Sequence, residues 1–177
     1  MRKLFHFLLN SYSVLFFTIT FACFLYYNLI EGENLSRAFL HAYLFCNIGV
    51  RGIVAFIANI YPPTALKIAK SYNWPEGASI QRELAAHMGA IGVLGILCLW
   101  FDGLFWLATV IAGTLSCLVS ETANFAIIFK EKIHPFVKRE IQTSYVVSKS
   151  LFAGMLLDVS LSLFSLILGL MNLIPAS

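Results

Sequence analysis

Five ionisable side chains interrupt the apolar stretches of this 177-residue chain, and they are the residues there most able to do chemistry. They are Arg51, Glu83, His87, Glu121 and Asp158. A charge near the centre of a bilayer costs about 2.5–3.5 kcal/mol on insertion scales, so such groups usually face the interior of a helix bundle and pair with one another. A guanidinium, an imidazole and carboxylates held together could bind or relay a small ion.

Sequence spacing places some of these residues beside other polar side chains. Glu83 and His87 are four residues apart, as are Asn47 and Arg51, so each pair would share one face of a helix. A narrow stripe of small and hydroxyl residues with spacings of three and four runs beside Glu121 and consists of Thr109, Gly113, Ser116, Ser120 and Asn124. We therefore predict one polar cluster on the cytoplasmic half of the membrane, formed by Arg51, Glu83, His87, Glu121, Asn124 and Asp158. The alternative is a purely structural ion pair of Arg51 with Asp158 or Glu121.

The elements that would hold these residues are long apolar stretches. Hydrophobic residues make up 59% of the chain and charged residues 12%, whereas a soluble domain is typically about 45–50% apolar and about 25% charged. A membrane-spanning helix needs about 20 mostly apolar residues. Five stretches qualify, at about 4–30, 35–61, 80–101, 104–129 and 145–174. The sequence therefore predicts an all-α fold in which residues 1–177 form one integral membrane domain, a polytopic transmembrane helix bundle with short loops.

The distribution of positive charge predicts how the chain threads the membrane. Ten of the twelve Lys and Arg residues lie at the N-terminus, in the segment 62–82 or between 130 and 149, whereas Arg37 is alone on the other side. Cytoplasmic loops carry the excess of Lys and Arg, so we expect a bacterial inner-membrane protein with a cytoplasmic N-terminus and an external C-terminus. The first stretch would be an uncleaved signal anchor. Basic residues scattered in this way do not form a nucleic-acid-binding surface.

Local signals predict the ends and contacts of the helices. Asn34 or Ser36 could cap the second helix, and Pro62-Pro63 would end it. The segment TALKIAKSYNW that follows alternates apolar and basic residues, which favours an amphipathic helix on the cytoplasmic leaflet. Gly89, Gly92 and Gly95 form a smooth strip of the kind on which helices pack closely.

The four cysteines point to packing rather than to metal or disulfide chemistry. Cys23, Cys46, Cys98 and Cys117 all fall inside apolar runs, and none belongs to a C-x-x-C motif. A cysteine in such a setting usually behaves as a small hydrophobic residue. We therefore expect buried thiols. The sequence leaves any cofactor unknown, and we predict none.

Three motifs between Ala65 and Ala126 resemble those of a known group of proteins. They are N-W-P-E-G-x-x-x-Q-R-E at 73–83, G-x-x-G-x-x-G at 89–95 and F-W-L-A-T-V-I at 105–111. This third of the chain resembles a family of small uncharacterised bacterial four-helix membrane proteins. Gln81 and Glu83 match that family's pattern, whereas Asn73, Ile80 and the segment from Glu121 to Asn124 depart from it. The resemblance implies an integral membrane protein and supplies no activity.

Two functions fit the predicted cluster best. One is transport of an ion or small solute, or an oligomeric channel, because titratable groups inside a membrane commonly line such pathways. Five helices without an inverted repeat are few for a complete carrier, which favours a homo-oligomer or a partner in a membrane complex. The other is a structural or assembly subunit with no site of its own.

Two further functions are less well supported. A redox module with bis-histidine haem needs two imidazoles at matched depth, but His41 and His87 differ by about 12 Å in depth by helix rise; His87 with another ligand, or a bound quinone, stays open. A metal-dependent membrane enzyme would need three or four ligands at its metal, and Glu83, His87 and Glu121 offer a weak set. We favour a protein that is not an enzyme.

Overall fold

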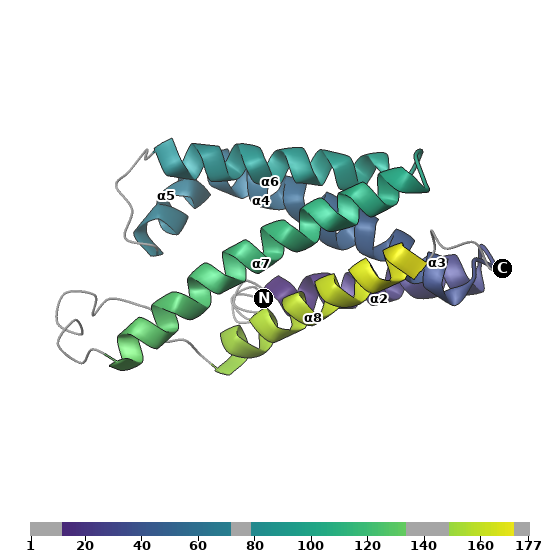
Figure 1. Ribbon diagram of the computed structural model, residues 1–177. Coiled ribbons are helices and arrows are strands. Elements are labelled where there is room, and N and C mark those ends of the chain that lie inside the picture. Colours follow the sequence, from purple (N-terminus) through teal and green to yellow (C-terminus); the bar gives the residue numbers. More distant parts are fainter. Residues whose placement is uncertain (1–11, 72–78, 134–148, 172–177) are drawn as a thin grey trace, which may run out of the picture.

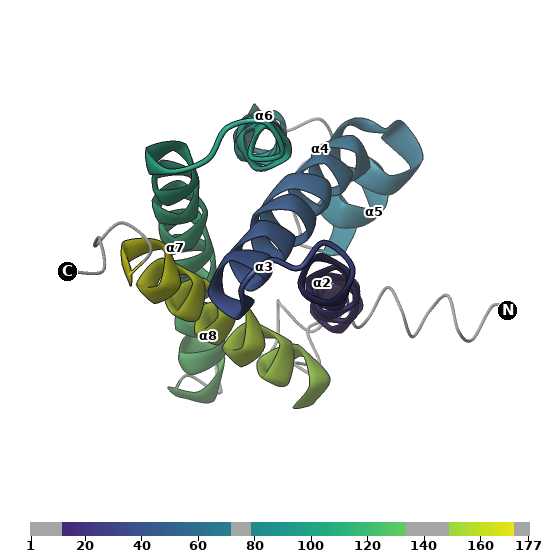
Figure 2. The same cartoon turned by 90° about the vertical axis from the view of Figure 1, so that its right-hand side faces the viewer.

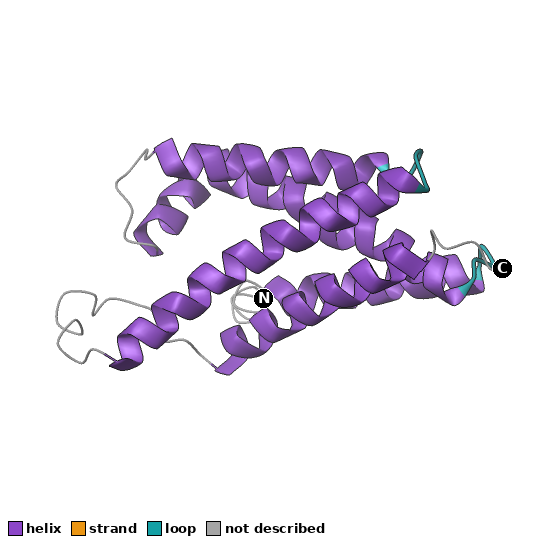
Figure 3. Ribbon diagram, in the orientation of Figure 1, coloured by secondary structure: helices purple, strands orange, loops and turns teal. Residues whose placement is uncertain are grey.

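The structure, a computed structural model, describes residues 12–71, 79–133 and 149–171, and over these residues it contains helices and no strand (Figures 1 and 3). The helices are α2 (Tyr12–Leu29), α3 (Leu35–Ala42), η1 (Tyr43–Val50), α4 (Arg51–Ile60), α5 (Pro62–Ser71), α6 (Ser79–Leu97), α7 (Leu104–Ile133) and α8 (Lys149–Met171). The all-α prediction is confirmed. The outer ends of the first and last predicted stretches lie outside the described residues.

The second predicted stretch is a single helical segment with an unexpected centre. It runs from Leu35 to Ile60, but the eight residues of η1 between α3 and α4 are π-helical. π-helical turns are rare and often occur at functional sites. Asn47 lies inside η1, and Arg51 is the first residue of α4.

Glycines bring this segment into close contact with α6. A Cβ on Gly95 would overlap the backbone of Gly49, and a Cβ on Gly52 would lie 2.7 Å from the Cα of Gly92. Gly92 and Gly95 therefore form a packing surface, as the sequence predicts. Its other half, Gly49 and Gly52, was not predicted.

The helix ends follow from local chemistry. Asn34 caps α3 by accepting a hydrogen bond from the backbone N–H of Arg37 at 2.9 Å, which confirms one of the two predicted caps. Tyr61 is extended and ends α4. Pro62 then begins α5, a position where the missing N–H of proline costs nothing. Residues 64–71 of the segment predicted as an amphipathic helix belong to α5, and residues 72–74 of it lie outside the described part of the chain.

The helices pack around the segment from Leu35 to Ile60. Figure 2 looks along the bundle and shows this segment at the centre, between α6, α2 and α8. In Figure 1, α5 and the start of α6 lie at the left-hand end, and the turn from α6 to α7 lies at the right-hand end. The buried core comprises Leu40, Tyr43, Leu44, Ile48, Cys98, Trp106 and Val110.

One described helix is both long and apolar enough to cross a bilayer. It is Leu35–Ile60, and 33% of its most apolar window is buried by the rest of the protein. Shorter apolar helical stretches occur at Ser13–Leu29, Leu104–Val119 and Leu156–Met171. Length and composition therefore identify a single candidate span within the described residues.

Candidate functional site

Arg51 and Asp158, which are 107 residues apart in the sequence, form a bidentate ion pair inside the bundle. Nη1 of Arg51 donates to Oδ1 of Asp158 and Nη2 donates to Oδ2, both at 2.7 Å. The side chain of Asp158 is 5% exposed, and that of Arg51 is 25% exposed. The planar guanidinium matches the carboxylate, a geometry that gives the strongest and most directional kind of ion pair. The structure therefore brings together two of the six predicted site residues.

Hydrogen bonds extend this pair into a network across three helical segments. Ser13 of α2 donates through Oγ to Oδ2 of Asp158 at 2.7 Å. Nη1 of Arg51 also donates to Oδ1 of Asn47 at 3.2 Å, and Nδ2 of Asn47 donates to Oγ1 of Thr20 at 3.0 Å. We call Ser13, Thr20, Asn47, Arg51 and Asp158 the central network. It ties α2 and α8 to the segment that contains η1 and α4.

The face of α8 that carries Asp158 continues as a row of buried hydroxyl groups. Ser162, one turn beyond Asp158, is 3% exposed, and its Oγ lies 2.9 Å from the hydroxyl of Tyr43. Oγ1 of Thr114 in α7 donates to the backbone carbonyl of Ser162 at 3.2 Å. Polar contacts therefore continue from the central network towards α7.

Glu83 and His87 do not join Arg51, and this part of the prediction is wrong. Both side chains are exposed on α6, and Nε2 of His87 lies 3.1 Å from Oγ of Ser116. The buried positions on α6 are Gln81, Ala85, Gly89, Gly92 and Gly95, and they define a helix face that excludes both residues. Gly52, the neighbour of Arg51, packs against Gly92, so Arg51 lies at about the level of Gly92 along α6. Glu83 precedes Gly92 by nine residues, which is about 13 Å of helix rise.

The remaining two predicted site residues belong to α7. Glu121 and Asn124 lie within its bounds, but their side chains fall outside the described part of the structure. Ser13, Thr20 and Tyr43 were missed by sequence reasoning. A polar residue in an otherwise apolar helix was the available signal for each, but such residues are common in membrane helices.

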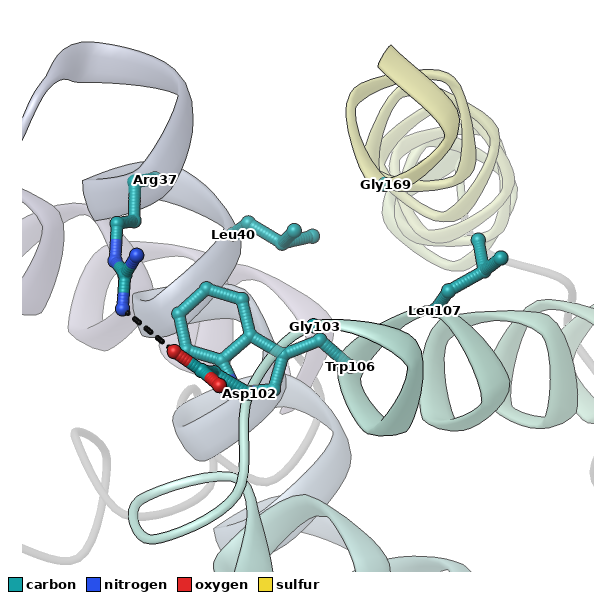
Figure 4. Close-up of a pocket in the computed structure, with 7 residues that line it drawn as sticks. All are labelled: Arg37, Leu40, Asp102, Gly103, Trp106, Leu107 and Gly169. Carbon is teal, nitrogen blue, oxygen red and sulfur yellow. Dashed lines mark hydrogen bonds and ion pairs between the residues drawn. The ribbon is translucent and has the colours of Figure 1, made fainter. Parts of the chain in front are cut away.

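A second charged cluster lies near the start of the segment from Leu35 to Ile60, beside the turn between α6 and α7. Nη2 of Arg37 donates a hydrogen bond to Oδ2 of Asp102 at 3.1 Å, and the guanidinium carbon of Arg37 lies 5.4 Å from the centre of the Trp106 ring. These residues line a pocket of about 160 Å³ (Figure 4). Close by, Nδ1 of His41 lies 3.4 Å from Oε1 of Glu33. This cluster is more exposed than the central network, since the Arg37 and Asp102 side chains are 51% and 67% exposed.

Potential metal ligands are dispersed. No three His, Cys, Asp or Glu side chains come close enough to hold a metal ion within residues 12–71, 79–133 and 149–171. The two histidines considered for haem, His41 and His87, lie in different regions, one in α3 and the other in α6.

The comparison with protein families gives one match. The model of a family of unknown function, DUF6790, matches residues 10–130 of this 177-residue chain. The chain belongs to the DUF6790 family. The match agrees with the expected membership of an uncharacterised family, and residues 73–111 lie within the matched range. In this DUF6790 protein Asp158 lies beyond the matched segment, whereas its partner Arg51 lies within it. No curated protein and no solved structure matches the chain.

Proposed function

We propose that this DUF6790 protein is a multi-span protein of a bacterial inner membrane that conducts or transports a small ion through the central network. The observation that carries the proposal is the ion pair of Arg51 and Asp158, placed among apolar helices and joined to Ser13, Asn47 and Thr20. Charged residues within apolar helices are costly to insert and commonly mark ion or proton pathways.

Exposed apolar side chains support lipid as the surroundings of the bundle. Large hydrophobic residues are exposed on several helices, for example Phe21 on α2, Ile57 on α4, Val93 on α6, Val119 on α7 and Ile167 on α8. A water-soluble monomer rarely exposes large contiguous apolar patches. Although the candidate span packs against other helices, only 33% of its most apolar window is buried, whereas the core helix of a soluble protein is mostly buried.

Helix direction and charge support the proposed threading. The long helical segments α2, Leu35–Ile60, α6, α7 and α8 alternate in direction, with the short helix α5 at one end and the α6–α7 turn at the other (Figure 1). Among the described residues, the end with α5 and the start of α6 carries Lys67, Lys70 and Arg82, whereas the opposite end carries the single basic residue Arg37. This asymmetry favours α5 on the cytoplasmic side. Reporter fusions test this orientation. A reporter that is active only in the cytoplasm should be active when fused after residue 70, and a reporter that is active only outside should be active when fused after residue 102.

A structural or assembly role is the second candidate, and one observation favours it. The oxygens of Asp158 accept bonds from both Arg51 and Ser13, so the carboxylate is well satisfied without a ligand. A closed network of this kind can serve simply to fix the relative positions of three helical segments. The two functions predict different ion flux for a variant in which the arginine and the aspartate of the pair exchange places.

Flux through purified protein in liposomes separates these functions. We expect the wild type to carry H⁺, K⁺ or Cl⁻, followed with ion-sensitive dyes, and Asp158→Asn to reduce the flux at least tenfold, because the removed charge belongs to the pathway. Asp102→Asn is the matched control, since it alters an Arg–Asp pair at the exposed cluster. The inverted pair Arg51→Asp/Asp158→Arg should fold but conduct with altered ion preference. Absence of flux in the wild type would reject transport of these ions, and an inverted pair with unaltered flux would reduce the central network to a structural role.

A further inference from the structure

Two cysteine sulfurs from different helices lie in direct contact. Sγ of Cys46 in η1 donates to Sγ of Cys23 in α2, and the two sulfurs are 3.2 Å apart. Both residues are thiols, as are Cys98 and Cys117. Sequence spacing gave no sign of this pair, because the 22 residues between the two cysteines include a complete turn between antiparallel helices. A disulfide bond is about 2.05 Å long, so the sulfurs need to approach by little more than 1 Å.

The surrounding backbone suits such a movement. Cys46 lies in the π-helical segment, which departs from the hydrogen-bond pattern of an α-helix and is of a kind often found at functional sites. On the other side, α2 buries few of its residues, among them Phe16 and Thr20. A small displacement of α2 towards η1 therefore disturbs little packing.

The cysteine pair adjoins the central network. Asn47 follows Cys46 directly, and it donates to Thr20, which lies three residues before Cys23. A covalent bond between Cys23 and Cys46 would hold α2 against η1 within one helical turn of that hydrogen bond. Such a bond restricts relative motion of the segments that carry Ser13 and Arg51.

We propose that Cys23 and Cys46 form a reversible disulfide, with a lipid-soluble quinone as oxidant, and that the bond regulates the central network. Each thiol loses its hydrogen, one S–S bond forms, and the two electrons and two protons reduce the quinone to its hydroquinone. A small apolar oxidant fits the location, because Cys46 is 1% exposed and Cys23 is half-buried among apolar residues. A dithiol reductant reverses the reaction. The regulatory part rests on the proposed function, whereas formation of the bond does not.

The bond is tested by counting thiols. Purified full-length protein in liposomes is treated with tetramethyl-benzoquinone, whose ring has no free position for thiol addition, and is then denatured and alkylated with a mass-tagged maleimide. Four tags are expected before oxidation, two after it, and four again after reduction by dithiothreitol. Cys98 and Cys117 should retain their tags, and peptide mapping should find Cys23 joined to Cys46.

Serine variants provide matched controls. Cys23→Ser and Cys46→Ser should each keep three tags after oxidation, whereas Cys98→Ser should keep one. Four tags on the oxidised wild type, or a bond that includes Cys98 or Cys117, would overturn the disulfide. Ion flux measured before and after oxidation tests the regulatory part separately. We expect at least a threefold change that is reversed by dithiothreitol and absent in Cys23→Ser, and unchanged flux in a protein that forms the bond would overturn regulation alone.

Discussion

Two Arg–Asp pairs of the same chemical type lie in contrasting parts of this molecule. Arg51 and Asp158 make two bonds of 2.7 Å inside the bundle, and the carboxylate is almost entirely buried. Arg37 and Asp102 make one bond of 3.1 Å at a helix turn, and more than half of each side chain is exposed. The sequence does not distinguish these pairs by residue type, so their energetic difference comes from their surroundings.

The contrast shows what burial does to an ion pair. In the exposed pair, water solvates either charge when its partner is absent, so the net contribution is small. In the buried pair, loss of one partner leaves a charge without solvent or counter-ion, which is far more costly than the pair's own net contribution. The hydrogen bond that Ser13 donates to Asp158 and the one that Asn47 accepts from Arg51 orient the buried pair, which raises the energetic difference between the two pairs further.

The largest expected effect comes from breaking the buried pair. Asp158→Leu should lower the free energy of unfolding by about 3–5 kcal/mol, because it leaves the guanidinium of Arg51 without its main counter-charge. The change is measured by denaturant titration in detergent micelles. The double variant Arg51→Met/Asp158→Leu is the control and should recover most of the loss. A single variant as stable as the wild type would show that Arg51 finds equivalent solvation elsewhere.

An intermediate effect is expected where α6 approaches η1. Gly95→Ala should cost about 1–3 kcal/mol, because the new Cβ would overlap the backbone of Gly49 and push α6 away from the segment that contains Asn47. Gly169→Ala, beside the exposed cluster, is the matched control. Its Cβ would meet only Leu107 at 3.5 Å, so it should be neutral or slightly stabilising. Equal melting temperatures for the two variants would contradict the close approach at Gly95.

The smallest effect should come from the exposed pair. Asp102→Asn should change the free energy of unfolding by about 0–1 kcal/mol, since both side chains are well solvated. The difference in free energy of unfolding between this variant and the wild type should be smaller at high salt than at low salt, because salt screens surface charges. A loss comparable to that of Asp158→Leu would mean that the Trp106 pocket depends on this pair, and the contrast between the two regions would fail.

Local signals in the chain sufficed for the helices and several of their ends. Long apolar runs require helices, because a helix satisfies its own backbone hydrogen bonds. Asn34 offers a side-chain oxygen at a helix start, and a proline pair cannot continue a helix, so the ends at Leu35 and Ile60 were predictable. The glycine strip on α6 was predictable too, since the spacing of its residues is a local property.

The membership of the candidate site was only partly predictable. The charged residues of the apolar runs were evident, but periodicity within one helix does not say which face meets another helix. Glu83 and His87 share a face that proves to be exposed, whereas Arg51 faces α8 and reaches Asp158. The π-helical turns of η1 add a further reason, because they rotate Asn47 and Arg51 away from the positions that an ideal α-helix would give.

The sequence by itself determined that this chain forms long apolar helices, where several of them end, and which few charged residues those helices must accommodate. These properties depend on backbone hydrogen bonding, hydrophobicity and side-chain chemistry within a few residues. Only the tertiary structure decided that Arg51 meets Asp158, that Gly49 meets Gly95 and that Cys23 touches Cys46. Each of these contacts joins separate helices, and it depends on how the helices rotate and cross, which no local pattern encodes.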